Sequence, residues 1–202
     1  MKKLLLLIIV ITLYNISFTQ VSSANYSKPF LSGFFTAKGY SKEISVFRAK
    51  SFLITDILGV SDGFGRFELE ALAASGSGEL TSLIYNCPDK NKSGMILGFY
   101  NDYWNDNGVI YQGYKFKNFT EEKALELFNT IDSIGDANSE YLKASPNSAN
   151  IFFSFEDLTF MFYGGWGPLS PIRIFWNGFD VDWEAVAYNR TESRFKEKIS
   201  KK

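Results

Sequence analysis

RFELEALA, residues 66–73, opens the stretch that decides the fold of this chain, and that stretch runs on to Lys117. Apolar side chains at every second position from Phe67 to Ala73 indicate a strand with one buried and one solvated face. Three further apolar segments follow, separated by turn residues: Glu79–Asn86, Met95–Tyr100 and Val109–Phe116. The pattern predicts an antiparallel meander in which residues 95–100 form a central strand covered on both faces.

Further elements are expected on both sides of this meander. Residues 29–40 and 43–59 have the apolar content of strands, and so do residues 151–155, 159–163 and 172–176. A helix should begin at Asn118 or Thr120 and end at Gly135, because acidic residues fill its first turn and apolar residues recur at helical spacing. A closing helix is expected to start at Asp180 or Asp182.

These elements predict an α+β fold, a mainly antiparallel meander with two helices packed on it. Strands followed by a helix occur from Glu79 to Ile134 and again from Ile151 to Ile199. This order suggests a duplicated β-β-β-α unit, although the two halves share no residue-level match.

The N-terminus has the pattern of a secretory signal peptide. Two lysines precede an apolar run from Leu4 to Leu13, which is shorter than the roughly 20 residues that span a bilayer. Ser22 and Ala24 are small residues placed for cleavage after residue 24. We expect residues 1–24 to be removed and residues 25–202 to form a single exported domain with no stable transmembrane segment. The alternative is an uncleaved membrane anchor.

Charge and residue usage exclude several function classes. The net charge is −1, from 21 basic and 22 acidic residues, so the chain as a whole lacks the basic surface of a nucleic-acid-binding protein. The chain has no histidine, which excludes a Ser-His-Asp triad and histidine zinc ligation. Cys87 is the only cysteine, so no internal disulfide can form. No cofactor is expected.

Glu68 and Glu70 are the candidate catalytic residues. In a strand they point to the same face about 7 Å apart, a separation at which two carboxylates can share acid and base roles around a glycosidic bond. The alternative is a solvated outer face on which Arg66 screens their charge.

Asp102 and Asp106 are the candidate metal ligands. They lie in residues 101–108, a stretch rich in oxygen-bearing side chains. The stretch does not fit a calcium-binding EF-hand, because Gly108 at the invariant glycine position places Tyr103 at the first ligand position. An irregular Ca²⁺ site is the remaining metal hypothesis.

Tyr103, Trp104 and Trp166 are the candidate ligand-binding residues. Tyr103 and Trp104 are expected in a hairpin loop, and Trp166 lies in the glycine-rich segment 164–168. Loops run over the surface, and Trp and Tyr combine a large flat face with a polar group, as binding sites require. The alternative is that both Trp rings fold back onto the sheet. Trp176 and Trp183 are expected in the core.

The leading hypothesis from the sequence is therefore an exported, non-catalytic binding protein. Its ligand would be a small molecule, a glycan, a lipid headgroup or a protein, held by the loop aromatics. One alternative is a carboxylate-dependent hydrolase that uses Glu68 and Glu70. Another is a secreted or periplasmic protein that inhibits or neutralises another protein.

Overall fold

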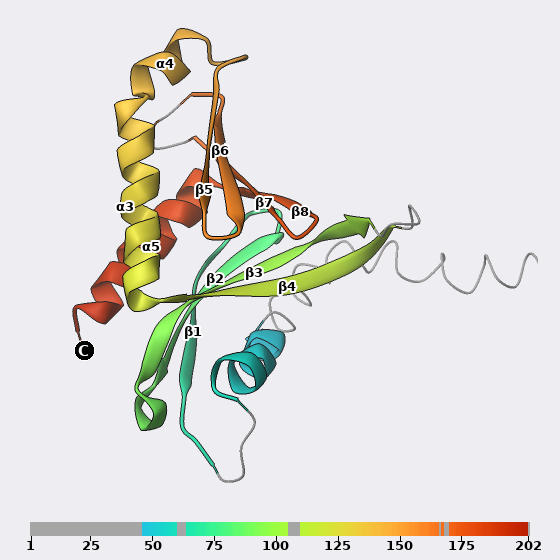
Figure 1. The fold of residues 1–202 in the computed structure, drawn as a ribbon, viewed down its shortest axis with the longest axis vertical. Coiled ribbons are helices and arrows are strands. Elements are labelled where there is room, and N and C mark those ends of the chain that lie inside the picture. The colour runs from blue at the N-terminus through green and yellow to red at the C-terminus, as the bar shows by residue number, and fades with distance from the viewer. Residues whose placement is uncertain (1–45, 60–63, 105–109, 166, 168–169, 202) are drawn as a thin grey trace, which may run out of the picture. The chain divides into compact units, whose positions relative to one another are not determined.

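The computed structural model describes residues 46–59, 64–104, 110–165, 167 and 170–201, with the backbone alone for 102–104 and 110–112. All of these residues belong to the unit Ile44–Lys202. In this part of the chain the strands form two four-stranded antiparallel sheets, in the orders β1-β2-β3-β4 and β5-β6-β7-β8 (Figure 1). The predicted α+β class, mainly antiparallel sheet, is confirmed.

The elements follow one another in two similar series. The first sheet contains β1 (Glu68–Ala74), β2 (Leu80–Cys87), β3 (Lys92–Trp104) and β4 (Ile110–Thr120), and is followed by α3 (Glu121–Ala137) and α4 (Ser139–Ala144). The second contains β5 (Asn150–Phe155), β6 (Leu158–Tyr163), β7 (Ile172–Trp176) and β8 (Phe179–Trp183), and is followed by α5 (Ala185–Ile199). The repeated order is thus four strands and a helix, one strand more than the β-β-β-α unit expected from the sequence.

Residues 46–57 are helical, although the sequence suggested a strand over 43–59. Residues 46–52 are α-helical and continue into the π-helical turn η1 (Leu53–Ile57). Ala49, Leu53 and Ile57 follow one another at four-residue intervals, so they lie on one helix face. That face packs against β2 and β3 in a buried cluster with Leu83, Tyr85, Cys87 and Ile96.

The opposite face of the first sheet belongs to the main hydrophobic core. This core also draws buried residues from α3, α5 and all four strands of the second sheet. Met95, Ile96, Leu97 and Phe99 of β3 are each 0% exposed. The prediction that residues 95–100 form a central strand covered on both faces is therefore confirmed for β3.

A β-bulge in β1 changes which of its residues are buried. The pairing with β2 shifts between Ala71 and Ala73. A bulge adds one residue to one strand, so the alternation of faces is broken there. Leu72 and Ala73 therefore both belong to the main core side, whereas Phe67 and Leu69 pack against the cluster on the opposite face. The regular alternation expected from Phe67 to Ala73 is wrong beyond the bulge.

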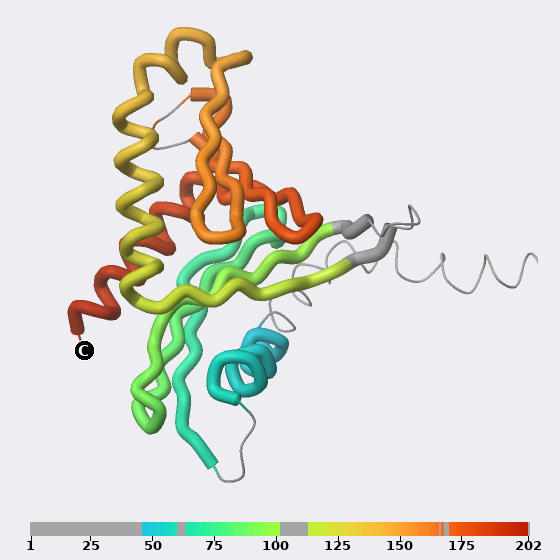
Figure 2. The backbone as a smooth tube through the Cα atoms, viewed as in Figure 1, coloured from blue at the N-terminus to red at the C-terminus, as the bar shows by residue number. Residues whose placement is uncertain are grey.

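Strands β3 and β4 form a long ribbon that extends beyond β2. The pairing of β2 with β3 ends at Leu80 opposite Phe99, and the β3–β4 ribbon continues past this point (Figure 2). The register keeps β3 paired with β4 as far as Trp104 opposite Ile110. Tyr103 and Trp104 therefore lie at the end of a strand rather than in the hairpin loop that the sequence suggested.

Helix α3 begins where the sequence predicted. The Thr120 hydroxyl accepts a hydrogen bond from the Lys123 N–H at 3.3 Å, which satisfies one free donor of the first turn. The helix does not stop at Gly135, which is buried inside it, but continues to Ala137. Asn138 then ends the helix, and its side chain donates a hydrogen bond to the Ile134 carbonyl at 2.8 Å.

The segment from Phe179 to Trp183 is a strand, so the expected helix start at Asp180 or Asp182 is wrong. Asn177 and Gly178 both have positive φ, 52° and 82°, and form the two-residue turn of a hairpin. Asn-Gly is the commonest sequence for such a turn. The turn returns the chain antiparallel to β7, and α5 begins at Ala185.

Polar contacts join the two halves of the fold. Lys117 of β4 forms an ion pair with Glu156 in the β5–β6 turn at 2.7 Å and a second one with Asp157. Asp157 also accepts a hydrogen bond from the Trp176 indole at 2.8 Å. The buried hydroxyls of Thr191 on α5 and Ser82 on β2 lie 2.6 Å apart. These contacts and the shared core tie the second sheet to the first.

Candidate functional site: the outer face of the second sheet

The structure places Glu68 and Glu70 on a solvated edge of the first sheet. The Glu70 carboxylate forms an ion pair with Lys198 of α5 at 2.6 Å, and its side chain is 61% exposed. Arg66, expected to screen both carboxylates, pairs with Asp89 instead at 3.0 Å. Exposed ion pairs of this kind are typical of solvated surfaces.

The candidate ligand and metal residues lie largely outside the described residues. The structure gives only the backbone of Asp102, Tyr103 and Trp104, while Asp106 and Trp166 are not described at all. Among the residues described, no group of three or more Asp, Glu or Cys side chains could hold a metal ion. Trp176 and Trp183 are 8% and 1% exposed, so their expected place in the core is confirmed.

The lone cysteine is a buried core residue. Cys87 is 0% exposed and belongs to the cluster between the first sheet and the helix of residues 46–57. Burial raises the pKa of its thiol. A thiol that is buried and protonated is a poor nucleophile, so Cys87 is a structural residue.

The second sheet has one packed face and one outer face. Its inward side chains contact the main core, and they include Phe160, Ile174, Val181 and Trp183. Figure 1 shows α3 and α5 on this inward side, and ring contacts of Trp183 with Phe128 and Tyr188 join the sheet to both helices.

The outer face of the β5–β8 sheet combines apolar side chains with a charged centre. Its strand register sets Phe152, Met161, Arg173 and Asp182 side by side, and beside them Ser154, Thr159, Phe175 and Asp180. Phe152 is 76% exposed and Phe175 is 37% exposed. These two phenylalanines share one face with Met161, which lies beside Phe152, and exposed apolar side chains that gather on one face mark a candidate contact surface.

Arg173 is fixed at the centre of this face by two carboxylates. Its guanidinium donates to Asp180 and forms an ion pair with Asp182 at 3.1 Å. The hydrogen bond from Arg173 to Asp180 raises the pKa of Arg173 above its usual range. The Tyr163 hydroxyl donates to the same Asp182 at 2.9 Å, and burial together with this bond raises the pKa of Tyr163. The face therefore presents a rigid charged group between aromatic side chains.

This face was not predicted from the sequence. Phenylalanines occur on both alternating sets of β5, so hydrophobicity alone does not indicate which set faces outward. The available signal lay in the neighbouring strands, where Arg173 stands between Ile172 and Ile174, and Asp180 and Asp182 flank Val181. Charged residues at alternate positions of two paired strands indicate one solvated face with cross-strand ion pairs.

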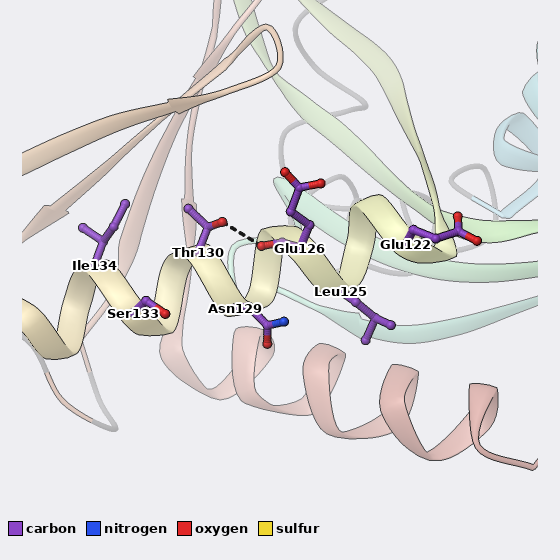
Figure 3. A pocket seen from close by; sticks show the side chains of 7 residues that line it. All are labelled: Glu122, Leu125, Glu126, Asn129, Thr130, Ser133 and Ile134. Carbon is purple, nitrogen blue, oxygen red and sulfur yellow. Dashed lines mark hydrogen bonds between the residues drawn. The ribbon is translucent and has the colours of Figure 1, made fainter.

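A shallow hollow lies on helix α3. It has a volume of about 640 Å³, and all seven side chains that line it belong to α3 (Figure 3). Thr130 in this group donates its hydroxyl proton to the carbonyl of Glu126 at 2.7 Å, one turn earlier in the same helix. A surface formed by a single helix cannot surround a small-molecule substrate in the way that ligand pockets do.

A second cleft, of about 210 Å³, lies between α3, α5 and the segment that connects β6 to β7. Asp132 lies in it and accepts a hydrogen bond from the Tyr188 hydroxyl at 2.8 Å. Burial raises the pKa of Asp132, and the nearby Glu192 raises it further, while the hydrogen bond from Tyr188 opposes the shift. A carboxyl with a raised pKa in a cleft is a feature of many active sites, but this volume is below the roughly 300–1,000 Å³ of typical ligand pockets.

The raised pKa of Asp132 predicts that the stability of the fold depends on pH. A carboxyl with a higher pKa in the folded than in the unfolded chain stabilises the fold while protonated, and this contribution is lost as the pH rises through the folded pKa. In Asp132→Asn the side-chain oxygen can still accept the hydrogen bond from the Tyr188 hydroxyl, but the side chain cannot ionise. We expect its melting temperature to rise relative to the wild type as the pH increases above about 4, the usual pKa of Asp.

Thermal melts of both proteins from pH 4 to pH 8 measure this difference. Glu140→Gln, on the exposed side of α4, is the control for the loss of one negative charge. Wild-type and Asp132→Asn melting temperatures that run parallel across the range would contradict the prediction.

Comparisons with known proteins do not place this chain in a family. No family model, no curated protein and no solved structure matches it. None of the helices in the described part of the chain combines the length and the hydrophobicity needed to cross a membrane.

Proposed function

We propose that this chain is a non-catalytic binding protein, and that its partner is another protein that docks on the outer face of the β5–β8 sheet. One observation carries the proposal: the exposed phenylalanines Phe152 and Phe175, 76% and 37% exposed, share a sheet face with an arginine that two aspartates hold in place. Preorganised aromatic and arginine side chains supply much of the binding energy at protein interfaces, because little conformational freedom is lost when they are buried.

The shape and charge of the face favour a protein over the glycan or lipid ligands also considered. The face lies across four strands, and neither the hollow on α3 nor the cleft between α3 and α5 lies on it. Aromatic residues, Met and Arg are enriched in protein interfaces, and this face contains Phe152, Met161, Phe175 and Arg173. Two aspartates against one arginine leave an excess negative charge, so we expect the partner to present a basic group beside Asp180.

The proposal includes export of the chain from the cytoplasm. The signal-like pattern of residues 1–24 supports a mature chain outside the cytoplasm. The participation of Tyr103, Trp104 and Trp166 stays a prediction, because their side chains lie outside the described residues.

The experiment introduces a photo-crosslinking amino acid at position 175, in the organism that produces the protein. A crosslinker at exposed Lys196, on α5, is the matched control. We expect a discrete adduct with a second protein from position 175 only. Met161→Glu, beside Arg173 in the register, should remove most of this adduct, and with the identified partner it should raise the Kd at least tenfold. Equal adducts from both positions, or an unchanged Kd, would contradict the proposal.

A further inference from the structure

In the described part of the chain, three of the four sheet edges carry the protection that natural proteins use against pairing with another strand. The edge strand β1 has Glu68, Glu70 and a bulge, and Arg194 of α5 donates to the Leu72 carbonyl. Charged side chains and bulges on an edge disfavour the addition of a further strand. The other two protected edges are β4, with Lys115 and Lys117, and β8, with Asp180 and Asp182. On β8 the Asn101 side chain also donates to the carbonyl of Asp180 at 2.8 Å.

The fourth edge, β5, lacks these features. Its six residues, Asn-Ile-Phe-Phe-Ser-Phe, include no charge and no proline, and its pairing with β6 is regular. Among the described residues no strand pairs with β5 on the side away from β6. Every second residue of an edge strand directs its N–H and C=O groups away from the sheet, so β5 presents unpaired backbone groups next to exposed Phe152.

We propose that β5 pairs antiparallel with β5 of a second copy of this chain, about a two-fold axis at Phe152. Residues directly opposite in an antiparallel pair share a sheet face, so a symmetric register must pair outward with outward residues. With the axis at Phe152, this residue lies opposite the partner's Phe152. Asn150 then lies opposite the partner's Ser154 on the outer face, and Ile151 lies opposite the partner's Phe153 on the inner face.

The composition of β5 favours a second copy as the occupant. A charged residue at or near a two-fold axis would lie close to its own copy, and like charges directly opposite are destabilising. The uncharged β5 has no such conflict. The register instead pairs aromatic with aromatic, amide with hydroxyl and aliphatic with aromatic side chains, all favourable cross-strand combinations. The dimer would join the two second sheets into one eight-stranded sheet.

Sedimentation velocity of the purified chain tests the dimer. We expect a concentration-dependent dimer, and Phe152→Lys should raise its Kd at least tenfold because it places two positive charges on the axis. Phe175→Lys is the control, since Phe175 lies on the same outer face but in the inner strand β7. A wild-type chain that stays monomeric up to its solubility limit, or equal weakening by both variants, would overturn the proposal.

Cysteine crosslinking tests the register. Phe152→Cys should form a disulfide-linked dimer on oxidation, because opposite residues have Cα atoms about 5.5 Å apart, within disulfide range. Ser154→Cys alone should not crosslink, but a mixture of Ser154→Cys and Asn150→Cys chains should. Native Cys87 does not interfere, because it is buried. Crosslinking at Phe175→Cys equal to that at Phe152→Cys would overturn the register.

The dimer does not rest on the proposed function, and the two can fail separately. Phe152 belongs to both the outer face and the edge, whereas the crosslinking and affinity tests of the proposed function use positions 175 and 161. Loss of the dimer with an intact position-175 adduct would therefore overturn the dimer alone.

Discussion

Phe128→Ala is expected to lower the free energy of unfolding by about 3–5 kcal/mol, the usual cost of removing a fully buried aromatic ring. Phe128 is 0% exposed on α3, and its ring lies 5.8 Å from Phe195, 6.0 Å from Tyr188 and 6.4 Å from Trp183 between centroids. These neighbours come from β8 and α5, so the ring joins α3 to two other elements. Little of the resulting cavity can close, because each neighbour is itself fixed by its own element.

The loss should appear in a single unfolding transition. The cluster that contains Phe128 also contains Met95, Leu97 and Phe99 of the first sheet, so damage in α3 weakens the packing of both sheets. Equilibrium urea unfolding followed by tryptophan fluorescence and by far-ultraviolet circular dichroism measures both the loss and its cooperativity. Phe64→Ala is the control, because Phe64 is 92% exposed and its removal should change stability by less than about 0.5 kcal/mol. Two separate transitions in the Phe128→Ala protein would contradict a shared core.

Local patterns in the sequence were enough to predict several elements correctly. The meander from β1 to β4, the start of α3 and the strands β5 and β6 each depend on interactions between residues close in sequence. Alternation of apolar and polar residues indicates a strand with one buried face. Thr120 followed by Glu121 and Glu122 indicates the start of a helix. Such signals need no knowledge of the rest of the fold.

Two elements were mispredicted although local signals for them exist. Residues 52–54 form a continuous apolar run that resembles a buried strand, yet Ala49, Leu53 and Ile57 carry the four-residue spacing of a helix face. Strand β8 was mistaken for a helix start because Asp180 and Asp182 are good helix caps. The Asn177-Gly178 turn just before them was the stronger signal, since it forces a hairpin.

The candidate site could not be found from local signals. The outer face is assembled from four strands, and Arg173 reaches Asp180 and Asp182 only because the β7–β8 register places them opposite it. The bulge in β1 is a similar case, because the buried position of Leu72 depends on its pairing with β2 and on the packing of α5. Registers and packing partners are long-range properties, which a period-two pattern does not contain.

Gly94→Ala is expected to be among the most damaging single-methyl additions to the first sheet. A Cβ atom at this position would lie 2.1 Å from the carbonyl oxygen of Phe119 and 3.0 Å from the Tyr85 hydroxyl. Gly94 is paired with Thr120 at the point where β4 ends and α3 begins, so the backbone of β4 crosses unusually close. Relief of the clash requires β4 to move, and with it the start of α3.

The identity of the obstructing atom sets the size of the effect. At Gly98 a Cβ would meet the Thr81 hydroxyl at 2.7 Å and the Phe116 ring at 2.9 Å, both side-chain atoms that can move. At Gly65 it would meet nothing within 4 Å. Overpacking in a core typically costs about 1–3 kcal/mol and more where the backbone must shift. We therefore expect about 3 kcal/mol or more for Gly94→Ala, about 1–2 kcal/mol for Gly98→Ala and less than about 0.5 kcal/mol for Gly65→Ala.

Urea midpoints of the three variants, at an unchanged denaturant slope, measure this order directly. Should Gly94→Ala prove too unstable to purify, the order of the other two variants still tests the argument. Gly98 and Gly65 differ in the same quantity, the distance from an added Cβ to the nearest atoms. A Gly98→Ala protein as stable as Gly65→Ala would mean that the Thr81 and Phe116 side chains rearrange without cost. A Gly94→Ala protein within about 1 kcal/mol of the wild type would contradict the argument. It would mean that the β4 backbone moves at little cost away from an added Cβ 2.1 Å from the Phe119 carbonyl oxygen, since no side-chain movement can relieve this contact.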